Sequence, residues 1–175
     1  MRPSRYLATT IVLAIGVGLT SMMSLASPLI LYPSSASLPA GPYVRSFDQP
    51  DVGKIIAFTP PEVAKRYWKT RGQGLPEGFL FMKPVIAGPG DRVCNSAEGL
   101  FVNDRLLALT ASHDAIGQAL PIWRGCGELV EGRYFMFSSH APNSFDSRYF
   151  GPIKVEVILG VYRPLLQSRE PASRH

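Results

Sequence analysis

The sequence predicts a mostly β domain of coiled antiparallel sheets, which follows one N-terminal membrane or signal helix. Short apolar or alternating runs recur along the 175 residues, 16 glycines and 16 prolines punctuate them, and helical periodicity is scarce. The composition, 46% hydrophobic and 18% charged, is typical of a globular domain with a real core. We therefore expect one folded domain behind a single N-terminal segment.

The N-terminal segment is apolar and has a basic flank. Arg2 and Arg5 precede it, and no charged residue occurs between Arg5 and Arg45. This stretch is long enough for a membrane helix of about 20 residues with its N-terminus in the cytoplasm. The small residues at 24–26 would equally suit cleavage of a signal peptide before Ser27. We predict a signal or membrane segment at 1–27, a domain at 28–166 and a disordered tail at 167–175.

The net charge of +5 is spread along the chain and is not gathered in one basic run. This pattern argues against a nucleic-acid partner and favours proximity to an anionic membrane surface.

A short loop of restricted conformation follows the apolar segment at residues 33–41. Pro33 and Pro39 bracket it, and each proline fixes its own φ and biases its predecessor toward extended geometry. Ser35 and Ser37 are two residues apart, so in an extended backbone their side chains point the same way. We interpret Ser37 as a candidate nucleophile and Ser35 as a donor to an oxyanion, although such loops are also typical of linkers.

Two strands are predicted after this loop, at 43–46 and 52–58, and then a short amphipathic helix from Glu62 to Lys69. The helix is predicted to carry its basic side chains outward, as a solvated surface rather than a binding patch. These side chains are Lys65, Arg66, Lys69 and Arg71.

Lys83 lies inside an apolar and aromatic run that otherwise predicts a buried strand at 79–87. An unpaired ammonium is costly there, so the side chain either extends to the surface or has a lowered pKa. A neutral lysine can act as the general base for a serine. The residues that follow, 88–91, predict a tight turn with a structural role.

The rest of the chain predicts further short strands, a hairpin with its turn at Asn103 and Asp104, and no assignable element at 110–122. The predicted strands lie at 100–102, 105–109, 132–140 and 155–161. Cys94 and Cys126 are the only cysteines, and in an exported domain a disulfide is favoured over free thiols. No histidine or cysteine lies at metal-ligand spacing beside them, and we expect neither a metal nor a cofactor.

Ser144, Asp146 and Arg148 alternate near the C-terminal end. A locally extended backbone would place them on one face, where the carboxylate and guanidinium can pair and the hydroxyl can orient a neighbour. A polar turn between two strands is the alternative interpretation.

Together these stretches resemble, in order and kind, the signature blocks of the type I signal peptidase family. The resemblance is greatest to its small conjugative-transfer branch, the TraF-type peptidases that mature a pilin precursor, and it spans most of the chain from Pro33 to about Gly160. The blocks are residues 35–39, 54–58, 83–91 and 144–151. Two departures favour the specialised branch: one residue fewer lies between Ser37 and Pro39 than in the housekeeping enzymes, and there is one membrane segment.

The resemblance implies a Ser/Lys serine endopeptidase with a fold of the signal-peptidase type. Ser37 would be the nucleophile, Lys83 the general base and Ser35 the oxyanion donor. Ser144 would orient Lys83, and Asp146 would form a site-shaping ion pair with Arg148. The implied partner is an exported pilin precursor for conjugative transfer, cyclised through an acyl-enzyme in this branch, and the implied location is the periplasm or the periplasmic face of the inner membrane.

Three alternatives compete with this interpretation. A non-catalytic exported assembly factor could keep the same fold. A self-cleaving Ser/Lys repressor would need a DNA-binding module, for which the apolar N-terminal segment leaves no room. A triad of a serine with His140 and Asp146 would need a spatial arrangement that closeness in sequence does not establish.

Overall fold

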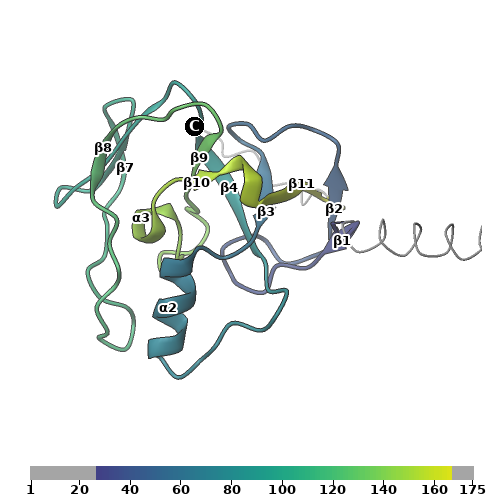
Figure 1. Cartoon of the computed structure of the whole chain (residues 1–175), viewed down its shortest axis with the longest axis horizontal. Coiled ribbons are helices and arrows are strands. Elements are labelled where there is room, and N and C mark those ends of the chain that lie inside the picture. The colour runs from purple at the N-terminus through teal and green to yellow at the C-terminus, as the bar shows by residue number, and fades with distance from the viewer. Residues whose placement is uncertain (1–26, 167–175) are drawn as a thin grey trace, which may run out of the picture.

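A computed structural model describes residues 27–166, which form two antiparallel sheets, a helix of nine residues and two shorter helical turns (Figure 1). The larger sheet has the strand order β1-β2-β11-β3-β4-β9-β10, and the smaller sheet has the order β7-β6-β5-β8. The larger sheet comprises β1 (Ile30–Leu31), β2 (Tyr43–Ser46), β3 (Ile55–Phe58), β4 (Phe81–Ala87), β9 (Arg133–Met136), β10 (Ile153–Lys154) and β11 (Ile158–Pro164). The smaller sheet comprises β5 (Arg92–Asn95), β6 (Leu100–Val102), β7 (Arg105–Ala108) and β8 (Gly125–Glu128).

The predicted mostly β, antiparallel class is confirmed for this part of the chain. The predicted N-terminal segment and the tail lie outside the described residues, apart from Ser27. Between residues 27 and 166, no helix has both the length and the apolar character needed to cross a bilayer.

Strands β3 and β4 form the middle of the larger sheet and are covered on both faces. Ile56 and Phe58 pack into the main core, whereas Ala57, from the opposite face, packs into a second cluster with Met82. A continuous apolar run, rather than an alternating one, is typical of a strand buried on both faces. The same burial explains why any polar side chain on β4 is removed from water.

Helix α2 (Glu62–Thr70) forms where the amphipathic pattern predicts it, and Figure 1 shows it below the sheets. Ala64 and Tyr67, three residues apart, are its buried positions. Lys65, Arg66 and Lys69 are exposed, as expected for a solvated face. Arg71 differs from the prediction, because it folds back and pairs with Asp114 instead of extending into solvent.

The hairpin of β6 and β7 is confirmed, with Asn103 and Asp104 in its turn. Their φ angles of 48° and 62° are both positive, as a two-residue type I′ turn requires. The predicted strand at 52–58 begins only at Ile55, because the Lys54 N–H bonds to the Asp51 carbonyl (3.1 Å) and closes a turn. Likewise, the segment predicted as a strand from 155 begins as a 3₁₀ turn, η1 (Val155–Val157).

Strand β8 has no strand-like sequence, since two of its four residues are glycine. It is held by pairing with β5, in which Cys94 lies directly opposite Cys126. The two cysteines form a disulfide across the strands, which confirms the predicted pairing.

Candidate active site

Ser37 lies in the loop that joins β1 to β2. The next residue, Leu38, is buried in the cluster of Tyr43, Ala57, Met82 and Tyr162, and so anchors the loop to the sheet. The Tyr43 hydroxyl donates to the Pro39 carbonyl at 3.1 Å. The expectation of an extended backbone from Ser35 to Ser37 is wrong, because the chain turns at residues 36 and 37. The two hydroxyls still face one another, at 3.2 Å.

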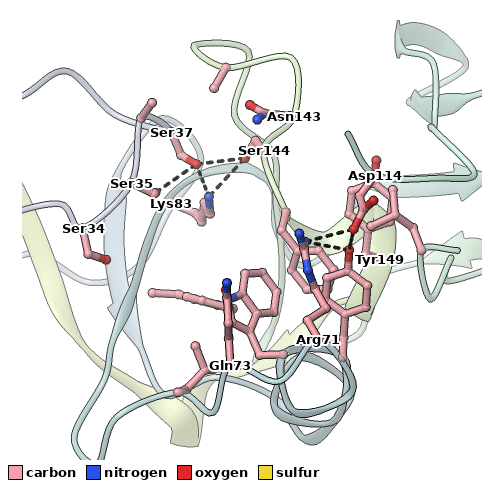
Figure 2. A pocket seen from close by; sticks show the side chains of 18 of the residues that line it. Ser34, Ser35, Ser37, Arg71, Gln73, Lys83, Asp114, Asn143, Ser144 and Tyr149 are labelled. Atoms are coloured by element: carbon pink, nitrogen blue, oxygen red, sulfur yellow. Dashed lines mark hydrogen bonds and ion pairs between the residues drawn. The ribbon is translucent and has the colours of Figure 1, made fainter. Parts of the chain in front are cut away.

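The Ser37 hydroxyl is the meeting point of three other polar side chains (Figure 2). Lys83 Nζ contacts it directly, and the hydroxyls of Ser35 and Ser144 each lie 3.2 Å away. Lys83 Nζ also donates to Ser144 Oγ at 3.1 Å. The structure therefore brings together four residues from three distant segments of the chain: the first loop, β4 and the segment before α3 (Ser147–Phe150).

Lys83 does not extend to the surface, since its side chain is only 4% exposed. Burial lowers its pKa from 10.5 to about 8. The nearby Asp146 carboxylate opposes that shift, and the Arg148 guanidinium adds to it. Because these two charges form a pair with each other, desolvation remains the dominant influence on Lys83.

Asp146 and Arg148 form a buried, two-pronged ion pair, with Nε–Oδ1 at 2.8 Å and Nη2–Oδ2 at 2.9 Å. Arg148 Nη2 also donates to the Ser144 carbonyl at 3.1 Å, which fixes the backbone behind the Ser144 hydroxyl. The predicted extended alternation from 144 to 148 is wrong beyond Asp146. Helix α3 starts at Ser147 because the Asp146 side chain caps it by accepting the Arg148 N–H.

Two buried polar residues at the site were missed by the sequence reasoning. The Ser138 hydroxyl donates to the Ser37 carbonyl and so holds the peptide next to the candidate nucleophile. Asn95 donates to the carbonyls of Trp123 (2.6 Å) and Arg148 (3.0 Å), which connects the smaller sheet to α3. Neither residue has a sequence spacing that signals these contacts, because the partners lie 28 to 101 residues away in the chain.

The alternative that pairs His140 with Asp146 is not supported. Both Asp146 carboxylate oxygens accept from Arg148, and the His140 side chain is exposed. Within residues 27–166, no hydrogen bond joins the two side chains.

The four clustered side chains open into a cleft of about 1060 Å³. One end is polar and is formed by Ser35, Ser37, Lys83 and Ser144, while aromatic side chains from α2, β4 and α3 line the other end (Figure 2). This volume slightly exceeds the roughly 300–1,000 Å³ usual for small-molecule sites, so the cleft has room for several residues of a peptide.

The chain is similar in sequence to proteins of one known family. A family model described as signal peptidase, peptidase S26, matches residues 4–166. A plasmid transfer protein TraF of Escherichia coli is 32% identical over 174 residues, covering 93% of this chain and 98% of the relative. Signal peptidase I V of Bacillus subtilis (strain 168) is 30% identical over 96 residues, covering 49% of this chain and 57% of the relative. A crystal structure of a signal peptidase I from Enterococcus faecalis V583 is 24% identical and covers 66% of this chain and 98% of that chain, with a TM-score of 0.37.

Proposed function

We propose that this chain, which belongs to the signal peptidase family S26, is a serine endopeptidase with a Ser/Lys dyad. Residues 28–166 would be the peptidase domain, with Ser37 as nucleophile and Lys83 as general base. The observation that carries the proposal is the contact between the Ser37 hydroxyl and a buried lysine whose pKa is lowered to about 8.

The first half of the reaction follows from this contact. Neutral Lys83 takes the proton of Ser37, and the Ser37 oxygen attacks the scissile carbonyl. The Ser37 N–H and the Ser35 hydroxyl stabilise the oxyanion. Lys83 then returns the proton to the leaving amine, and an acyl-enzyme remains. Ser144, held by the Asp146–Arg148 pair, keeps Lys83 Nζ aimed at Ser37 throughout.

The second half decides the product. Water attacking the acyl carbon gives a linear product and regenerates Ser37. If the substrate's own N-terminal amine attacks the acyl carbon in place of water, the product is cyclic. This outcome requires that the amine is held near the acyl carbon and that water is excluded from it.

We propose that the substrate is an exported pilin precursor for conjugative transfer, because relatives of this chain are named as transfer proteins. The domain would then work in the periplasm, either free or anchored at the inner membrane.

The test is mass spectrometry of a pilin precursor expressed with and without the full chain. A shortened product supports the peptidase, and a cyclic one is lighter than the linear one by one water. An unprocessed precursor would instead favour a non-catalytic assembly factor.

Activity should depend on pH through Lys83. The base must be neutral, and the charged form dominates below its pKa of about 8. We therefore expect kcat/KM to rise about tenfold per pH unit up to about pH 8 and then to level off. Stopped assays of peptide cleavage between about pH 5.5 and 10 measure this profile. A profile that is flat from pH 6 upward, or that levels off near 10.5, would contradict a neutral Lys83 base.

Replacing Ser35 with alanine should slow the chemical step without abolishing it. One of two oxyanion donors is lost, so we expect kcat to fall by roughly 10²- to 10³-fold while substrate binding changes little. Ser35→Thr keeps the hydroxyl and should keep most of the rate. Single-turnover kinetics separate binding from chemistry. An unchanged rate would make Ser35 a loop serine, and a loss as complete as that of Ser37→Ala would make it a nucleophile or a folding residue.

A further inference from the structure

The cleft continues beyond Ser37 and Lys83 to a surface that the proposed chemistry does not use (Figure 2). We call this surface the aromatic wall. It consists of Tyr67, Trp68, Phe79, Phe81, Phe145 and Tyr149.

The aromatic wall is built around Phe145, which directly follows Ser144. The Trp68 ring lies edge-on to Phe145 at 4.7 Å between centroids, while Tyr67 and Tyr149 stack on Phe145 at 5.0 and 5.2 Å. Such pairs hold one another in fixed orientations. The wall is therefore a preformed surface, and it adjoins the Ser144 hydroxyl in the chain.

Asp114 joins the two segments that frame the wall. One carboxylate oxygen accepts from the Tyr67 hydroxyl of α2 at 2.6 Å and lies 3.0 Å from Arg71 Nη1. The other oxygen accepts the backbone N–H groups of Ile116 and Gln118, both at 2.9 Å. These contacts fasten α2 to the irregular segment at 110–122, so the width of the cleft is fixed at this end.

The charged groups at this end, Arg71 and Asp114, pair with each other, although the buried Arg71 Nε has no hydrogen-bond partner among the described residues. Arg71 pairs with Asp114 and its guanidinium lies over the Tyr67 ring, 5.5 Å from the centroid. Four members of the wall, Tyr67, Phe81, Phe145 and Tyr149, are 9% exposed or less, so the ring surface open to the cleft comes mainly from the partly buried Trp68 and Phe79. The nearby charges of Arg71 and Asp114 are already paired, so this surface suits an apolar rather than an ionic side chain. Burying a large apolar group against such rings is favourable, whereas an alanine would leave ring surface in contact with water.

We propose that the aromatic wall is a specificity site that binds one large aliphatic or aromatic side chain of the substrate polypeptide. The proposal rests on the proposed peptidase function. A substrate side chain is the expected ligand of the wall, because the wall and the Ser37–Lys83 pair line the same cleft. A chain whose carbonyl lies at Ser37 can place a nearby side chain on the wall.

The test uses the full chain in detergent and internally quenched peptides in which one position at a time is Ala, Leu or Phe. At one position, we expect kcat/KM for Leu or Phe to exceed that for Ala by at least about tenfold, as a few buried methylene groups imply. Trp68→Ala should reduce this ratio to about one, because the Leu and Phe peptides lose their contact with the Trp68 ring. Trp68→Leu, which fills more of the space, provides the same comparison if the alanine variant folds poorly.

Arg66→Ala is the matched control, since Arg66 is exposed on the opposite face of α2. It should leave the ratio unchanged. A second readout does not need catalysis: the Ser37→Ala chain is titrated with the Leu and Ala peptides while tryptophan fluorescence is recorded. The Leu peptide should bind at least about tenfold more tightly.

The outcomes distinguish the two proposals. If no peptide is cleaved but the Leu peptide still binds preferentially, the peptidase function fails and the binding site stands. The proposal of a specificity site is wrong if Leu and Phe peptides are cleaved no faster than the Ala peptide at every position. It is also wrong if Trp68→Leu and Trp68→Ala both keep the parent's ratio of kcat/KM values.

Discussion

Replacing Ser37 with alanine is expected to abolish processing, with a loss in kcat on the order of 10⁶-fold, because no other group can form the acyl-enzyme. The domain should remain folded. The Ser37 side chain is 4% exposed, yet its removal leaves Lys83 bonded to Ser144, so the cost should be about 1 kcal/mol. Product formation is followed by mass spectrometry, and unfolding is followed by circular dichroism.

Ser34→Ala is the control for this variant. Ser34 lies in the same loop, is exposed, and forms none of the bonds of the Ser37 cluster in Figure 2. Its loss should leave the rate within about twofold of the parent, as for a surface substitution. Processing by Ser37→Ala at near the parent rate would mean that the nucleophile lies elsewhere.

Lys83→Met is expected to be inactive and, at neutral pH, more stable than the parent. Removing the base stops proton transfer from Ser37, so the rate should fall by roughly 10⁴-fold or more. The stability gain follows from linkage: the pKa of Lys83 falls from 10.5 to about 8 on folding, so the unfolded chain binds the proton more tightly. Below pH 8 this destabilises the parent by on the order of 3 kcal/mol, and the effect fades as the pH rises from 8 to 10.5.

Chemical denaturation at pH 7 and near pH 10.5, the unperturbed lysine value, measures this difference. The gain of Lys83→Met over the parent should be large at pH 7 and small at the higher pH. Lys54→Met, which removes an exposed lysine just before β3, should change stability by less than about 1 kcal/mol at both. Active Lys83→Met protein would exclude the dyad, and equal gains at the two pH values would exclude a charge penalty at Lys83.

Local sequence signals predicted those parts of the fold that local chemistry determines. The positive φ angles at Asn103 and Asp104 suit asparagine and aspartate, and the apolar run of β4 is typical of a buried strand. Strand β8 could not be predicted, because its glycines disfavour a strand and only pairing with β5 and the disulfide hold it there. Tertiary contacts overrode the local preference.

Some residues of the candidate site are likewise signalled by the local sequence, and others are not. A lysine within an apolar run predicts either an exposed side chain or a buried one with a lowered pKa. The structure shows that Lys83 is buried and that its pKa is lowered. Ser144, Asp146 and Arg148 lie close together, but not on the extended backbone that their alternation predicts, since a helix cap brings Arg148 back to Asp146. Ser138 and Asn95 carry no signal of their own, because an ordinary serine or asparagine becomes part of a site only through partners 101 or 53 residues away.

The strand order of the larger sheet has a consequence for the timing of activity. In the part of the chain that the structure describes, β2 pairs with β1 and with β11, and Leu38 beside Ser37 packs on Tyr162 of β11. The loop that carries Ser37 emerges early in synthesis, but part of its support comes from β11, the last strand among the described residues. Contacts between such distant segments form late, because a long chain must first close on itself. A chain on which β11 has not yet folded therefore lacks part of the support that holds Ser37 beside Lys83. Under the proposed peptidase function, an incompletely folded chain would be inactive.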